Sequence, residues 1–91
     1  MRKKDLVQKI SKITGVSGRK VSLIINAFLE EISQALERGE RVELRGFGVF
    51  KVTTRREKEM FQPRTGERIT LPSHLFPYFK PGKKLKERVK E

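Results

Sequence analysis

The chain of 91 residues has no cysteine and one histidine, His74, and it carries 22 Lys and Arg against 11 Asp and Glu. These totals exclude disulfide bridges and thiolate metal sites, and a chain of this length forms at most one domain. Because so short a chain buries little apolar surface by itself, we expect a partner subunit. Its apolar runs are too short to span a membrane and no signal segment opens it, which predicts a soluble, intracellular protein.

The net charge of +11 is distributed unevenly along the sequence. Residues 1–20, 51–68 and 80–91 are basic, residues 21–50 carry three positive and five negative side chains, and residues 69–79 carry no charge. A basic periphery around a near-neutral core indicates a polyanionic partner. Duplex DNA is the first candidate, RNA the second and an anionic membrane the third. The alternative is that the lysines and arginines only keep the protein soluble.

Apolar residues at helical spacing predict two helices in the first part of the chain. The first covers residues 3–14 and ends at Gly15. The second follows the N-cap residue Ser17 and runs to about Arg38, where Gly39 provides a left-handed stop. Its apolar stripe is wider than one packing face requires, which predicts that another subunit covers part of it.

After Gly39 the apolar residues alternate, as they do in strands. Residues 41–45 and 49–54 predict a hairpin closed by Gly46-Phe47-Gly48. Strand character continues to Arg55 and returns at residues 69–71, beyond a turn formed by Pro63 to Gly66.

The turn around Arg64 and Thr65 fixes the pairing of the flanking residues. It places Phe61 opposite Arg68, Met60 opposite Ile69 and Lys58 opposite Leu71. This ribbon has too few apolar residues to be buried, so we expect an arm, about residues 53–76, that projects from the body.

The expected fold is α+β in a single domain of residues 1–91. It has two N-terminal helices (1–39), an antiparallel three-stranded sheet with a long protruding β-ribbon arm (40–80), and a C-terminal region (81–91) whose short helix, roughly Lys83 to Lys90, follows Pro81-Gly82.

Catalytic constellations are nearly absent from the sequence. Ser17 and Lys20 have the Ser-x-x-Lys spacing of some serine hydrolases, but this serine stands where the second helix needs its cap. Gly46-x-Gly48 lacks the third glycine of a dinucleotide fingerprint, and His74 has no second histidine or carboxylate cluster nearby. We therefore predict a protein that is not an enzyme and uses no cofactor or metal.

The arm has the features of a nucleic-acid ligand. Its cations are Arg55, Arg56, Lys58, Arg64 and Arg68. A two-stranded ribbon is thin enough to lie along a DNA groove, where such cations can meet phosphates. Pro63 at its tip is a rigid apolar ring that can wedge between base pairs. The alternative is a charged, solvated hairpin with an ordinary turn proline.

Three separated motifs carry a resemblance. They are Gly46-Phe47-Gly48-Val49-Phe50, Pro63-Arg64-Thr65-Gly66-Glu67 and Phe79-Lys80-Pro81-Gly82-Lys83-x-Leu85-Lys86. In order and spacing, over essentially the whole chain, they resemble the bacterial HU and integration host factor family of histone-like proteins.

The resemblance implies an intertwined dimer, either a homodimer or a heterodimer with a paralogous subunit. Two arms would embrace the minor groove of double-stranded DNA with Pro63 at each tip, while Lys3, Lys83 and Lys86 would hold phosphates of the bent flanks. It implies bending and compaction of DNA in the bacterial cytoplasm, in the nucleoid, without a cofactor. The predicted DNA-binding residues are Pro63, Arg55, Lys58, Phe61, Gln62, Arg64, Arg68, Arg45, Lys3, Lys80, Lys83 and Lys86.

The chain departs from the family pattern in two places. The family usually has Gly-Arg-Asn before the tip proline, whereas this chain has Met60-Phe61-Gln62, so Phe61 replaces a minor-groove arginine. This predicts a change in the affinity of the arm and not in its placement. Val42-Glu43-Leu44-Arg45 is similar to one integration host factor subunit, which implies that Glu43 and Arg45 help to select a DNA sequence. The alternative is a solvated strand face.

Two other functions remain open from the sequence. An RNA-binding or single-strand-binding chaperone-like protein would use the ribbon as a platform and stack Phe61 on a base. A polybasic module would dock on an anionic membrane or an acidic protein, although such binders more often use an amphipathic helix.

Overall fold

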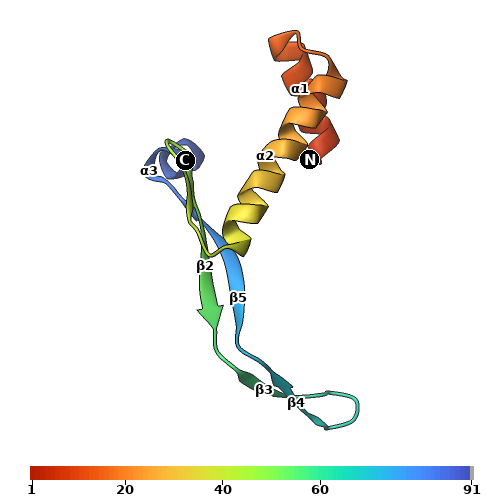
Figure 1. Ribbon diagram of the computed structural model, residues 1–91, viewed down its shortest axis with the longest axis vertical. Helices are drawn as coiled ribbons and strands as arrows, with labels where there is room; N and C mark the ends of the chain where they lie inside the picture. Colours follow the sequence, from red (N-terminus) through yellow and green to blue (C-terminus); the bar gives the residue numbers. More distant parts are fainter. Residues whose placement is uncertain (91) are drawn as a thin grey trace. The chain divides into compact units, whose positions relative to one another are not determined.

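The computed structural model describes residues 1–90 and contains three helices and five strands in this range (Figure 1). Contacts divide the chain into two compact units, residues 1–35 and residues 36–91. The first unit is helical, and the second contains the end of the long helix, the strands and the last helix. Within the described residues, none of the helices combines the length and the apolar character needed to cross a membrane.

The first unit consists of α1 (Lys3–Thr14) and most of α2 (Gly18–Glu37). The backbone N–H of Lys20 donates to Ser17 Oγ at 3.3 Å, so Ser17 caps α2 as predicted. Gly39 has a φ of 78° just beyond the last turn, which confirms the left-handed stop.

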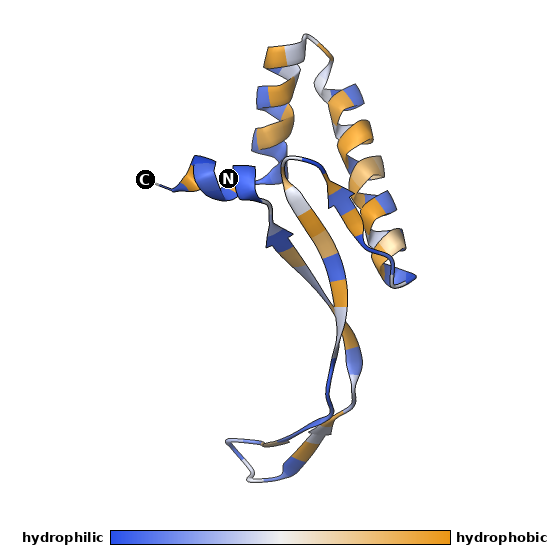
Figure 2. Cartoon of the chain, turned by 90° about the vertical axis from the view of Figure 1, so that its left-hand side faces the viewer, coloured by the Kyte–Doolittle hydropathy of each residue, from blue (hydrophilic) through white to orange (hydrophobic). Residues whose placement is uncertain are grey.

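Little of this unit is buried in the single chain. Val21, Ile32 and Ala35 are its buried apolar residues. Four large apolar residues of α2 are 47–65% exposed: Leu23, Ile24, Phe28 and Leu29. Figure 2 shows the hydrophobic colour along much of α2. An exposed apolar face of this kind is typical of an interface with another molecule.

The second unit contains an antiparallel three-stranded sheet. Its order is β1-β2-β5, with β1 (Val42–Leu44), β2 (Gly48–Arg55) and β5 (His74–Pro81). The β1–β2 hairpin closes through the predicted turn, where the N–H of Phe47 donates to the carbonyl oxygen of Leu44 at 2.8 Å.

The two faces of this sheet differ in character, because side chains alternate along each strand. One face carries Val42, Leu44, Phe50, Val52 and Phe79. The other carries Glu43, Val49, Lys51, Tyr78 and Lys80. On the apolar face the Phe79 ring centroid lies 4.9 Å from that of Phe50 and 5.3 Å from that of Phe47. The sheet therefore presents its cations on the face opposite this aromatic cluster.

The strands β3 (Lys58–Phe61) and β4 (Arg68–Leu71) form a second, two-stranded ribbon. The three predicted pairs, Phe61 with Arg68, Met60 with Ile69 and Lys58 with Leu71, are confirmed. At the tip, the N–H of Gly66 donates to the carbonyl oxygen of Gln62 at 2.8 Å, and Gly66 has a φ of 72°. Turn chemistry therefore fixes the register of the ribbon.

Over the range of the predicted arm, about residues 53–76, the structure has two ribbons in series (Figure 1). Residues 56–57 and 72–73 separate the β2–β5 pairing from the β3–β4 pairing. Pro72 lies in this segment and has no N–H to donate to a ladder. The outer ribbon and its tip, residues 58–71, are called the outer arm below.

The predicted short C-terminal helix, roughly Lys83 to Lys90, is present in the structure. Pro81 belongs to β5, and α3 covers Lys83–Val89. The N–H of Gly82 donates to the carbonyl oxygen of Phe47 at 2.9 Å, which ties the start of α3 to the hairpin turn. Glu91 lies outside the described residues.

Candidate nucleic-acid interface

An open groove of about 390 Å³ lies where the sheet meets α3. Its cationic lining is Arg41, Lys51, Lys80, Lys83 and Lys86, and Val49, Pro81 and Gly82 complete it. We call these residues the basic groove. Five positive side chains around one hollow reinforce each other's potential, so the groove attracts a polyanion. The Arg41 guanidinium also lies 3.8 Å from Glu43 Oε2, but both side chains are exposed and such a pair contributes little.

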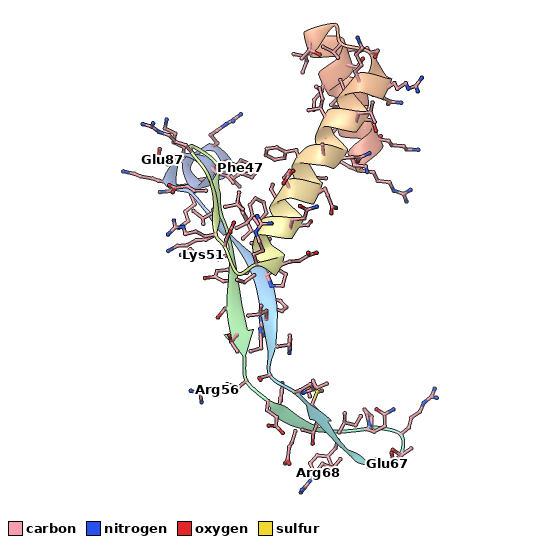
Figure 3. All side chains as sticks on the ribbon, in the orientation of Figure 1. Phe47, Lys51, Arg56, Glu67, Arg68 and Glu87 are labelled. Atoms are coloured by element: carbon pink, nitrogen blue, oxygen red, sulfur yellow. The ribbon has the colours of Figure 1, made fainter. Side chains whose placement is uncertain are left out.

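Strand pairing positions the cations of the sheet. Val49 in β2 lies opposite Lys80 in β5 and opposite Glu43 in β1. Lys51, two residues further along β2, points to the same face. Figure 3 shows the Lys51 side chain projecting from the strand.

The start of α3 positions the other two cations of the groove. The hydrogen bond from Gly82 to Phe47 holds the first turn of α3 against the β1–β2 turn. Lys83 and Lys86 are three residues apart on this helix, so they share a face. The predicted residues Lys80, Lys83 and Lys86 are therefore brought together.

A smaller hollow of about 210 Å³ lies at the junction between the two ribbons. It is lined by Arg55, Arg56, Lys58, Met60, Leu71, His74 and Phe76. The Arg55 guanidinium carbon lies 3.9 Å from the centroid of the Phe76 ring, a cation–π geometry. His74 Nδ1 lies 3.1 Å from the carbonyl oxygen of Pro72, to which an Nδ1–H donates. His74 is thus part of the junction, and its ring faces a backbone carbonyl.

The outer ribbon also has two distinct faces. One carries Lys58, Met60, Ile69 and Leu71, and the other carries Glu59, Phe61, Arg68 and Thr70. On the second face the Arg68 guanidinium lies 3.9 Å from Glu59 Oε1 and 6.0 Å from the Phe61 ring centroid (Figure 3). Arg68 therefore has a carboxylate and an aromatic ring as neighbours. The predicted residues Gln62, Pro63 and Arg64 lie in the turn that joins the strands.

Two predicted site residues are not among the residues that line the basic groove or form the ribbons. Lys3 belongs to the helical unit, where its Nζ donates to Asn26 Oδ1 at 2.7 Å. Arg45 lies in the turn between β1 and β2 and is not among the lining residues of the groove.

Sequence reasoning missed two members of the basic groove, Arg41 and Lys51. Both stand at alternate positions of predicted strands, but their approach to Lys80 depends on pairing across three strands. The signal that could have found them is the alternation itself, because the apolar partners Val42 and Phe50 assign the opposite face.

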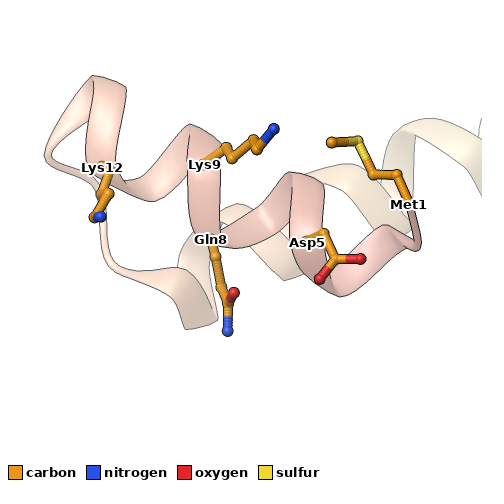
Figure 4. A pocket seen from close by; sticks show the side chains of 5 residues that line it. All are labelled: Met1, Asp5, Gln8, Lys9 and Lys12. Carbon is orange, nitrogen blue, oxygen red and sulfur yellow. The ribbon is translucent and has the colours of Figure 1, made fainter.

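Other parts of the described chain offer no catalytic arrangement. A hollow of about 550 Å³ along α1 is lined by Met1, Asp5, Gln8, Lys9 and Lys12, which mix both charges (Figure 4). Among residues 1–90 there is no group of His, Asp and Glu that could hold a metal ion. The hydrogen bond and the charge of Arg38 lower the pKa of Glu40, which is fully exposed and forms a surface ion pair.

The comparisons with known proteins agree with this geometry. The family model described as "Bacterial DNA-binding protein" matches residues 1–90. DNA-binding protein HU of Thermotoga maritima is 42% identical over 90 residues, which is 99% of this chain and 100% of that protein. The integration host factor subunit beta of Saccharophagus degradans is 41% identical over 92 residues, which is 100% of this chain and 94% of that protein.

A solved structure of Anabaena HU, co-crystallised with DNA, superimposes with a TM-score of 0.93 at 32% identity. The match covers 99% of this chain and 98% of the Anabaena chain. The resemblance inferred from the three sequence motifs is thus confirmed by family, sequence and fold. The chain belongs to the bacterial DNA-binding protein family, with HU and integration host factor among its relatives.

Proposed function

We propose that this protein is an architectural DNA-binding protein that binds duplex DNA as a dimer, bends it and compacts it in the bacterial nucleoid. The observation that carries the proposal is the basic groove, where Lys51 and Lys80 of the sheet meet Arg41 and the α3 residues Lys83 and Lys86. The relatives support it, since they include a DNA-binding protein HU and an HU crystallised with DNA. Members of this family are not enzymes, and no cofactor enters the proposal.

The exposed apolar face of α2 supports the dimer. Phe28 and its neighbours on α2 would be covered by a second subunit, either identical or paralogous. A dimer supplies the burial that a single small chain lacks.

The proposal assigns two kinds of contact to the protein. In the body, the basic groove would hold phosphates, and Lys3 and Arg45 would add to it in the assembled dimer. In the arm, Arg55, Lys58, Gln62, Arg64 and Arg68 would line the minor groove, and Pro63, with Phe61 beside it, would enter between base pairs. HU and integration host factor are known examples of proteins that insert apolar side chains between base pairs. In such complexes, unstacking costs a few kcal/mol per base step.

The experiment that tests this function is a competition between nucleic acids of equal length. Labelled duplex DNA bound to the protein is challenged with unlabelled duplex DNA, duplex RNA and single-stranded DNA. We expect duplex DNA to compete best, because the proposed arm contacts require the minor groove of a B-form duplex that can bend. Stronger competition by single strands or RNA would favour the chaperone-like alternative, with the exposed Phe61 ring stacked on a base.

Ionic strength supplies a second readout. Each phosphate neutralised contributes about −0.9 to the slope of log affinity against log salt concentration, so binding should weaken steeply with salt. A flat response would contradict a role for the basic groove.

A further inference from the structure

His74 is the single histidine of the chain, and it lies at the junction between the two ribbons. It is the first residue of β5 and pairs with Arg55, the last residue of β2. Directly opposed residues of an antiparallel pair point to the same face, so the imidazole and the Arg55 guanidinium share one side of the sheet. By the same alternation, this is the face that carries Lys51 and Lys80. The exposed His74 therefore stands on the cationic face of the sheet.

The immediate surroundings of His74 carry positive charge and no negative charge. The junction hollow has six other lining residues, three cationic and three apolar: Arg55, Arg56, Lys58, Met60, Leu71 and Phe76. In the described part of the chain, no carboxylate lines this hollow. Glu57 is not among its lining residues, and Glu59 lies on the opposite face of the outer ribbon, beside Arg68. The hollow therefore attracts an anion that the protein itself does not supply.

A hydrogen bond determines which nitrogen of the His74 ring can meet a ligand. Nδ1 lies 3.1 Å from the carbonyl oxygen of Pro72. Because a carbonyl oxygen only accepts, Nδ1 carries the proton in this contact. Nε2 makes no hydrogen bond to residues 1–90, and in the neutral ring it bears a lone pair. A phosphate oxygen also only accepts, so the ring can bind a phosphate through Nε2 only after Nε2 has taken up a proton.

We propose that His74 is a proton-dependent DNA contact, in which the imidazolium donates from Nε2 to a phosphate oxygen of the duplex at the base of the outer arm. The inference rests on the proposed function, because the same duplex is the ligand. A phosphate beside the ring favours the charged form, so the complex holds more protons than the free protein does. Binding that takes up protons becomes tighter as the pH falls. The arm therefore holds DNA more tightly in acid, over the range of about pH 5 to 8 in which histidine changes its charge.

The test is the affinity for a duplex that carries a pH-insensitive dye, measured by fluorescence anisotropy at constant ionic strength between about pH 8 and about pH 5.5. For each His74 in the complex, the unaltered protein should bind about fivefold more tightly at the acidic end, the scale of one exposed ionic contact. His74→Gln cannot take up a proton and should show no such rise. His74→Lys is charged throughout this range, so its affinity should not depend on pH.

Ser73→Ala is the matched control. Ser73 precedes His74 in the segment that separates the two ribbons and has no titratable side chain. This variant should keep the full pH response of the unaltered protein. The amino terminus also titrates near neutral pH, but it is the same in every variant. Circular dichroism at both ends of the pH range checks that each variant is folded.

Two further measurements separate a phosphate contact from a merely structural role of His74. The slope of log affinity against log salt concentration should be steeper at about pH 5.5 than at about pH 8, by up to about 0.9 for each His74 that contacts a phosphate. His74→Gln should have the same slope at both pH values. Nuclear magnetic resonance follows the ring directly, because one histidine gives one set of imidazole signals. The pH at which the ring becomes protonated should rise when the duplex is added.

Three results would overturn the role of His74 while leaving DNA binding intact. They are an affinity of the unaltered protein that does not change with pH, a His74→Gln variant that keeps the rise in acid, and a ring whose protonation is unaffected by the duplex. Absence of duplex binding at every pH would instead overturn the proposed function, and the role of His74 with it.

Discussion

Gly48 in β2 lies so close to Lys80 in β5 that an added methyl group would stand 2.6 Å from the Lys80 carbonyl oxygen. The same methyl group would stand 2.6 Å from the ring of Phe79. No side chain fits in this space, so glycine is required here by packing. This close approach lies between the two strands that carry Val49, Lys51 and Lys80 of the basic groove.

Gly48→Ala should therefore destabilise the protein. We expect a loss of about 1–3 kcal/mol in the free energy of unfolding, the range for overpacking a closely packed site. Urea denaturation at fixed protein concentration measures it. Gly18→Ala is the control, because a methyl group there meets nothing within 4 Å and the residue is helical. An equally small effect of both substitutions would contradict the packing at Gly48.

Ser17→Ala should weaken the start of α2. The Ser17 hydroxyl accepts the N–H of Lys20, and loss of such a cap costs about 1 kcal/mol. In the control Ser33→Ala, the lost hydroxyl donates to the Leu29 carbonyl oxygen inside the helix, where it is of little benefit to stability. Thermal unfolding compares the two, and a larger loss for Ser33→Ala would contradict the capping role.

Phe28→Ala should weaken dimerisation. If a second subunit covers the exposed face of α2, truncating this ring should reduce the free energy of dimerisation by about 3 kcal/mol, the scale for an aromatic side chain lost from a core. Sedimentation equilibrium measures the dissociation constant. Glu31→Ala, at an exposed polar position of the same helix, should leave it unchanged. A monomeric unaltered protein at high concentration would refute the dimer.

Phe61→Arg should restore a cation at the position where the family usually has arginine. The substitution adds one positive charge to the outer arm, so duplex affinity should rise at low salt and the salt slope should steepen by about 0.9. Fluorescence anisotropy across a salt series measures both quantities. Unchanged affinity together with a smaller bend would instead assign the Phe61 ring to the wedge beside Pro63.

Much of the fold could be predicted because single residues in the sequence mark the turns and the helix ends. Pro63 and Gly66 fix the tip of the arm, and from the tip the pairs of the outer ribbon follow by counting. Ser17 and Gly39 likewise mark the ends of α2. The interruption of the arm could not be predicted in this way, because a proline near a strand end fits either a continuous edge or a break.

Only part of the basic groove could be predicted from the sequence, because the rest depends on the pairing of distant strands. The motif around Phe79 to Lys86 identified three of its lysines. Arg41 and Lys51 join them only through the register of β1, β2 and β5, which depends on distant pairing.

DNA bending is the central claim, and one measurement tests it most directly. A duplex of a few tens of base pairs carries a fluorescent donor and acceptor at its two ends, and energy transfer is followed as protein is added. We expect the ends to come closer on binding, and Pro63→Ala to reduce this approach by more than it reduces affinity, because the wedge sets the kink and phosphates supply most of the binding. Saturated binding with no change in the distance between the ends would contradict the account.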